Sequence, residues 1–184
     1  SGDNFSAMGS DSAFGMFDTM GTDMVMGLEG DQMAGMFDAM GPEHFGEIGG
    51  DQMFDMVGNM SGDNFSAMGS DSAFGMFDTM GTDMVMGLEG DQMAGMFDAM
   101  GPEHFGDIDG NQMFDMVGNM SGDNFSEMGS DSAFGMFDTM GSDMVIGLEG
   151  DQLAGMFGAM EHDQIGHMEG DMVFDVFQSV GTEG

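Results

Sequence analysis

The chain has 184 residues, of which 35 are Asp or Glu and none is Lys or Arg, so its formal net charge at pH 7 is −35. Nucleic acid and anionic membrane surfaces attract cationic side chains, and this composition excludes both as partners. Cys is also absent, which excludes disulfides and thiolate metal sites. Met occurs 30 times and Phe 18 times, so we expect a core built from these two residue types.

Two nested repeats organise the sequence. Residues 1–60 recur at 61–120 with three changes, at positions 107, 109 and 111. A third copy, 121–180, diverges after about residue 158, and residues 181–184 resemble the start of a further unit. Each copy divides into three looser units of twenty residues. The sequence therefore predicts one continuous solenoid of nine units, grouped as three copies.

The longer part of each unit, taken in chain order, predicts a helix. Met53, Met56, Val57 and Met60 have the i, i+3, i+4, i+7 spacing of one helix face, and Asp51 stands where an N-cap or first-turn acid belongs. The same pattern predicts helices near 11–19, 31–39 and 51–59, and at the same offsets in later copies. The apolar face contains most of the Met residues, including Met16, Met20, Met36, Met40, Met56 and Met60. We interpret them as core, packed against Phe, in preference to soft-metal ligands.

The shorter part of each unit predicts a helix of about two turns beside a Gly-containing corner. Pro42 fits the first position of such a helix, and Glu43 fits its first turn. Phe45 and Ile48 then share one face. An all-α solenoid follows, in which each unit completes its core by stacking on its neighbours. The alternative is a β-solenoid with twenty-residue coils, which the scarcity of Val, Ile and Thr disfavours.

The Gly-Pro-Glu-His-Phe-x-x-Ile motif of residues 41–48 and the Gly-Asp-Gln-Met-x-x-Met motif of residues 50–56 indicate a wider kinship. They resemble the short helical tandem repeats of large, acidic bacterial surface and secreted proteins. This resemblance implies an extracellular or cell-surface location and a structural or adhesive role. It implies no chemistry.

The histidines are the first candidates for chemistry. His44 and His104 each follow a Glu at a helix start, which would suit acid–base catalysis. No nucleophile accompanies them by spacing, so we interpret them as solvent-facing and predict that the protein is not an enzyme. His167 lies at i+4 from Asp163, with His162 nearby, and this group could form a weak metal pair; we favour a surface role.

The acids carry the strongest functional signal. One Asp comes late in each of several predicted helices, where the helix dipole disfavours an anion. With no basic side chain available, a cation is a reasonable compensator, and Ca²⁺ accepts carboxylate ligands with tolerant geometry. The candidate metal ligands are Asp18, Asp38, Asp55, Asp78, Asp98 and Asp115. Asp107, Asp109 and Asn111 begin the EF-hand spacing, but Gln112 occupies its Gly position. A diffuse cation atmosphere is the alternative to specific sites.

Three functions remain open on the sequence. The first is a structural protein, in the form of a filament, appendage or spacer, whose partner is itself through head-to-tail assembly or further repeats. The second is a calcium- or cation-binding module. The third is an ice- or mineral-binding surface, for which the sequence has few Thr residues.

Overall fold

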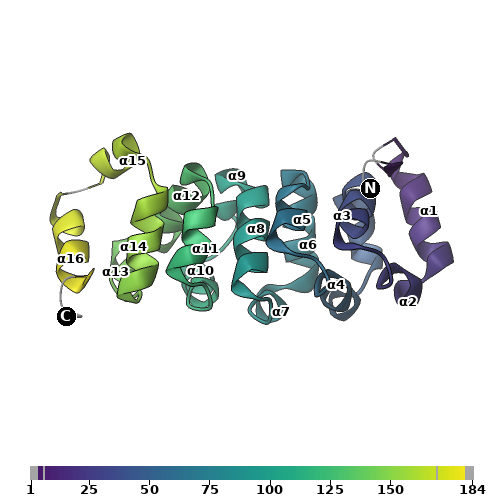
Figure 1. The fold of residues 1–184 in the computed structure, drawn as a ribbon, viewed down its shortest axis with the longest axis horizontal. Helices are drawn as coiled ribbons and strands as arrows, with labels where there is room; N and C mark the ends of the chain where they lie inside the picture. Colours follow the sequence, from purple (N-terminus) through teal and green to yellow (C-terminus); the bar gives the residue numbers. More distant parts are fainter. Residues whose placement is uncertain (1–3, 6, 169, 181–184) are drawn as a thin grey trace. The chain divides into compact units, whose positions relative to one another are not determined.

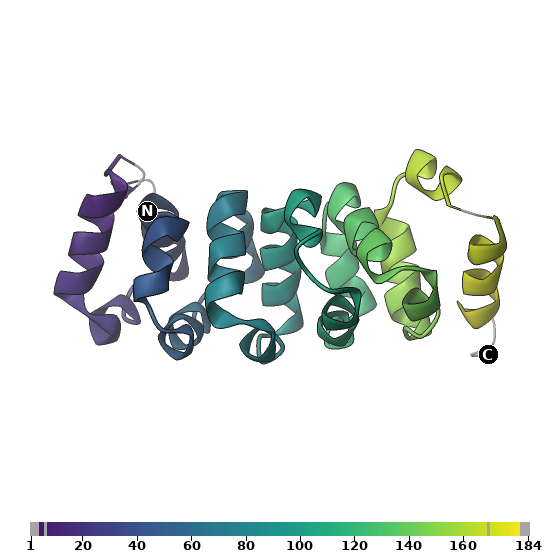
Figure 2. The ribbon, with the colours of Figure 1, turned by 180° about the vertical axis from the view of Figure 1, so that it is seen from behind.

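The computed structural model describes residues 4–5, 7–168 and 170–180, and within these residues the regular structure is entirely helical (Figures 1 and 2). The protein is therefore all-α, and the β-solenoid alternative is wrong. The longer helices are α1 (Ser10–Met20), α3 (Gly30–Met40), α4 (Gly50–Val57), α6 (Ser70–Met80), α8 (Gly90–Met100), α10 (Gly110–Val117), α12 (Ser130–Met140), α14 (Gly150–Ala159) and α16 (Gly170–Val180). The shorter ones are α2 (Thr22–Val25), the 3₁₀ helix η2 (Pro42–Glu47), α5 (Gly62–Ser66), α7 (Thr82–Val85), α9 (Pro102–Phe105), α11 (Gly122–Glu127), α13 (Ser142–Val145) and α15 (His162–Gly166).

The helices predicted near 11–19 and 31–39 are confirmed as α1 and α3. The helix predicted near 51–59 is confirmed as α4, although it ends at Val57 with Gly58 as its C-cap. The 3₁₀ helix η2 has six residues and makes the expected two turns, whereas other short helices are briefer, and α2 and α7 have four residues each. Pro42 stands in the first turn of η2, as its fixed φ angle predicts.

A glycine with positive φ ends several of the eleven-residue helices. Gly21, Gly41, Gly81, Gly101 and Gly141 have φ between 71° and 76°, a region that L side chains rarely adopt. In the third copy Glu161 stands where Gly41 and Gly101 stand in the other two, and its φ is −83°. The preceding helix α14 ends one residue earlier than α3 and α8, at Ala159. The divergence after residue 158 therefore changes how the chain leaves the helix.

The chain divides into two compact units. The first extends to Leu88 and includes Gly95–Met100, and the second comprises Glu89–Ala94 and the chain from Gly101 onward. The boundary passes through α8 instead of following the ends of the sixty-residue copies. Among the described residues, no helix is both long and apolar enough to cross a bilayer.

Each unit packs its helices in the same pairs. In the first unit α1 lies beside α3, and α6 packs against both η2 and α4 (Figures 1 and 2). In the second unit α12 packs against α9 and α10, and α11 packs tightly against α14. Helices α10 and α12 are the counterparts of α4 and α6, sixty residues further along the sequence. The repeated sequence therefore produces the same helix contact twice.

Met and Phe side chains form the core, as the sequence predicts. Met36, Met40 and Met56 are fully buried, and Met60 nearly so. Met16 and Met20 in α1 are only half-buried, so the expectation that these two are core residues is wrong. The largest fully buried side chains include Phe37, Phe45, Phe65, Phe97, Phe105 and Phe125.

Glycines inside the helices permit close packing between helices. A Cβ on Gly155 of α14 would lie 2.6 Å from the Cα of Gly122 in α11, and a Cβ on Gly95 of α8 would likewise meet the backbone of Gly62 in α5. A methyl group does not fit at this separation. These glycines therefore set the distance between neighbouring helices.

Candidate functional site

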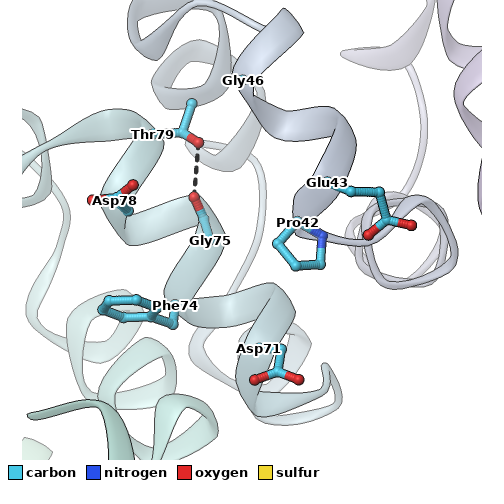
Figure 3. A pocket seen from close by; sticks show the side chains of 8 residues that line it. All are labelled: Pro42, Glu43, Gly46, Asp71, Phe74, Gly75, Asp78 and Thr79. Carbon is cyan, nitrogen blue, oxygen red and sulfur yellow. Dashed lines mark hydrogen bonds between the residues drawn. The ribbon is translucent and has the colours of Figure 1, made fainter.

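A groove of about 440 Å³ between η2 and α6 is a candidate ligand site of the first unit (Figure 3). Pro42 lies on one side of the groove, where a Cβ on Gly75 of α6 would approach its Cβ to 2.6 Å. On the other side, the hydroxyl of Thr79 donates a hydrogen bond to the carbonyl of Gly75 at 2.8 Å. The remaining lining residues are Glu43, Gly46, Asp71, Phe74 and Asp78.

The same groove occurs again in the second unit. It lies between α9 and α12 and has a volume of about 340 Å³. Its lining residues Pro102, Gly106, Asp131, Phe134, Gly135, Asp138 and Thr139 are the counterparts of the first groove's residues, sixty positions on. Because the repeated packing of the helices produces this groove twice, the groove alone is not evidence of a ligand site.

Acidic side chains border the first groove but do not converge. Figure 3 shows the carboxylates of Glu43, Asp71 and Asp78 spread around it instead of pointing toward one another. Hydrogen bonds to the carboxylate from its own backbone and from Ser10 hold the pKa of Glu43 below its usual range, and His44 adds to this effect. Glu43 is therefore ionised and already hydrogen-bonded within the protein. The groove would repel an anionic ligand.

The six aspartates predicted to bind metal lie on separate helices. Asp18, Asp55, Asp78 and Asp115 are exposed, and Asp98 is half-buried. Within residues 4–5, 7–168 and 170–180, no three Asp, Glu or His side chains gather into a group that could hold a metal ion. Of the six, only Asp78 lines a groove described above. Calcium binding by these residues stays a prediction.

The negative charge of Asp38 is stabilised by a backbone group that the sequence analysis did not identify. Its carboxylate accepts a hydrogen bond of 2.9 Å from the backbone N–H of Gly69, the N-cap residue of α6. Asp151 interacts in the same way with the N–H of Gly122 at 3.4 Å. Helix N-termini favour anions, so a neighbouring helix stabilises each of these carboxylates. Because the partners are 31 and 29 residues apart in the sequence, only the packing brings them together.

His44 does not face solvent, which corrects the interpretation made from the sequence. Its side chain is only 15% exposed and its ring stacks on Phe14, with centroids 4.6 Å apart and planes 2° from parallel. Its Nε2 lies 3.4 Å from a carboxylate oxygen of Asp11, which is itself fully exposed. The group joins η2 to α1 and can form an ion pair whenever the imidazole is protonated.

The last two histidines are exposed, as we expected. The Nδ1 of His167 lies 2.6 Å from the backbone carbonyl oxygen of Asp163. The imidazole therefore contacts the backbone of Asp163, the residue considered above as its partner in a weak metal pair. His162 opens the same short helix, α15, two residues before Gln164. The amide of Gln164 donates to Asp131 at 2.9 Å, which connects α15 to α12.

Comparison with known proteins adds no further constraint on this site. No protein-family model matches the chain, no curated protein matches it, and no solved structure does.

Proposed function

We propose that this protein is a structural repeat protein, a spacer or filament component whose twenty-residue units stack as a solenoid. The observation that carries the proposal is the recurrence of whole contacts at sixty-residue intervals. A Cβ on Gly50 would lie 2.8 Å from the carbonyl oxygen of Thr79, and a Cβ on Gly110 would lie 2.7 Å from that of Thr139. In solenoid proteins each repeat contacts its neighbours through the same interface, and this recurrence supports a stacked, spacer-like role.

The acidic surface fits such a role. A chain with 35 carboxylates and no Lys or Arg stays soluble and resists non-specific association through self-repulsion. The resemblance to repeats of acidic surface and secreted proteins supports an extracellular or cell-surface location. It also supports a chain that continues into further repeats or associates with itself.

The proposal is tested by changing the number of copies. One variant carries an additional copy of residues 61–120, inserted directly after residue 120. Small-angle scattering measures the maximum dimension of this variant and of the unmodified chain. We expect one added copy to lengthen the particle in one direction at constant cross-section, and to raise the midpoint of urea unfolding. A particle that grows equally in all directions would contradict the proposal.

A cation-binding module is the second candidate, because carboxylates without basic partners favour bound Ca²⁺. Circular dichroism during a chelator titration separates the two functions. Specific sites predict loss of helix at a fixed ratio of chelator to bound metal, and restoration by Ca²⁺ but not by Na⁺ at equal ionic strength. A diffuse ion atmosphere predicts the same recovery with either salt once the ionic strength is matched.

A further inference from the structure

One apolar contact joins successive copies inside the chain. The ring of Phe54 in α4 lies against the corner after α7, where a Cβ on Gly87 would be 3.1 Å from its Cζ. Phe114 in α10 lies against Gly147 in the same way, at 3.5 Å. Both phenylalanines are half-buried. A Cβ at Gly87 would crowd the ring of Phe54, and one at Gly147 would touch the ring of Phe114.

The third phenylalanine of this series meets no such glycine among the described residues. Phe174 in α16 stands sixty residues after Phe114, and it is 62% exposed. The corner that corresponds to Gly87 and Gly147 near the start of the chain is Gly27. Among the described residues, a Cβ there would meet only the carbonyl oxygen of Met24 within 4 Å, so no described phenylalanine covers it. The described chain thus holds one unpaired ring and one uncovered corner.

The surface around Gly27 is also more exposed than its internal counterparts. Met24 is 66% exposed, whereas its counterparts Met84 and Met144 are half-buried. Leu28 is half-buried, whereas Leu88 is 6% exposed. Met24, Ile146 and Phe174 are the exposed large hydrophobic residues of the described chain, and two of these three belong to this pair of surfaces.

We propose that Phe174 of one molecule packs on the Gly27 corner of a second copy, between Met24 and Leu28. This contact continues the interface that already occurs twice within the chain. Phe54 and Phe114 each precede their glycine by 33 residues. If a second copy is numbered on from residue 180, its Gly27 stands at the same separation from Phe174. The contact is heterologous, since each molecule offers a different surface to each neighbour, and it therefore adds molecules head to tail unless the rotation between neighbours closes a ring.

Charge opposes this association. Two molecules that each carry a formal charge of −35 repel one another at low salt, while the Phe174 contact itself is apolar. Salt shortens the Debye length to about 3 Å at 1 M and removes most of the repulsion. Association is therefore expected to strengthen as the ionic strength rises, in contrast to an interface held by ion pairs.

The inference deepens the proposed structural role, and the test separates the two. Sedimentation velocity is measured at micromolar protein in 1 M NaCl for the full chain and three variants. Phe174→Ser removes the ring, and Gly27→Gln fills the corner without changing the charge. Ile146→Ser is the control, because it removes an exposed apolar side chain elsewhere.

We expect the unmodified chain and Ile146→Ser to form species larger than a dimer. Phe174→Ser and Gly27→Gln should each raise the apparent Kd of association at least tenfold and stay monomeric. A mixture of these two variants should form a one-to-one dimer and stop there, because one intact corner meets one intact ring. Circular dichroism checks that each variant keeps its helix content.

Monomers of the unmodified chain at every concentration would overturn the inference. So would single variants that assemble like the unmodified chain, or a mixture that stays monomeric. None of these results bears on whether an added copy lengthens the particle, so the structural role can stand while the proposed contact falls.

Discussion

Helices α1 and α6 have the same eleven residues but different surroundings. One face is alike in both: Phe17 and Phe77 are each 8% exposed, and each packs on a phenylalanine of the following unit, at 6.4 and 6.3 Å between centroids. A second face differs. Met76 is fully buried, whereas Met16 is half-buried.

The unequal burial of Met16 and Met76 follows from the presence of η2 beside α6. Gly75 faces Pro42 and Phe45 of η2, and a Cβ there would lie 2.6 Å from the ring of Pro42. Nothing lies within 4 Å of a Cβ on Gly15, which holds the same position in α1. One face of each helix is thus covered by the following twenty-residue repeat, and the other face by the preceding one. Identical sequences become core or surface according to their neighbours.

The largest effect is expected at Gly95, which holds this same helical position in α8. Its Cβ would collide with the backbone of Gly62, which cannot move aside as a side chain can. Gly95→Ala should lower the free energy of unfolding by about 3 kcal/mol or more. Urea unfolding followed by circular dichroism measures the change. Gly106→Ala is the control, because its Cβ would meet open space, and an equal loss in both variants would contradict the packing argument.

Replacing Met in α6 and α1 should give unequal losses. Met76→Ala removes a fully buried side chain and should cost about 2–5 kcal/mol in the free energy of unfolding. Met16→Ala removes a half-buried side chain and should cost less than half as much. Urea midpoints of the two variants measure this difference. Equal losses would show that α1 is covered as completely as α6.

A similar contrast is expected at the glycine corners. Gly87→Gln must displace the ring of Phe54 and should cost about 1–3 kcal/mol in the free energy of unfolding. Gly27→Gln meets no ring and should leave the unfolding midpoint of the monomer unchanged within error. Thermal unfolding at low salt measures both. A loss at Gly27 equal to that at Gly87 would count against the assignment of the uncovered corner.

The smallest effect on stability is expected at Glu43, which lies in η2 and contacts Ser10 of α1. Hydrogen bonds lower the pKa of its carboxyl group in the folded protein, so its stabilisation is complete above its unfolded pKa of about 4.3. That contribution disappears as the pH falls through the lowered value. Glu43→Gln should therefore reduce stability slightly at pH 7 and not at all once the pH lies below that value. Glu47→Gln, an exposed acid on the same helix, is the control for net charge.

The sequence predicted the helices well, because their positions follow from local spacing. Met53, Met56 and Val57 share one face at intervals of three and four, and all three are buried. Pro42 marks the start of its helix in both sequence and structure. These signals lie within one unit, so no knowledge of the packing is needed to interpret them.

Features that depend on packing could not be predicted in this way. The partner of Asp38 is a backbone N–H 31 residues away, and the burial of His44 depends on the ring of Phe14, 30 positions before it in the sequence. Periodicity also cannot distinguish Met16 from Met76, since their surrounding sequences are the same. The sequence also gives no sign that glycines inside the helices, such as Gly75 and Gly95, are sites of close contact.

Paired alanine substitutions at Gly15 and Gly75 test the central claim most directly. Both replace glycine in the middle of an identical helix, which alone favours alanine by about 1 kcal/mol. Gly15→Ala should therefore raise the urea midpoint. Gly75→Ala should lower it, because the new methyl group collides with Pro42 and Phe45 at a cost of about 1–3 kcal/mol. Opposite signs would support the account, and a shift of the same sign and size in both variants would contradict it.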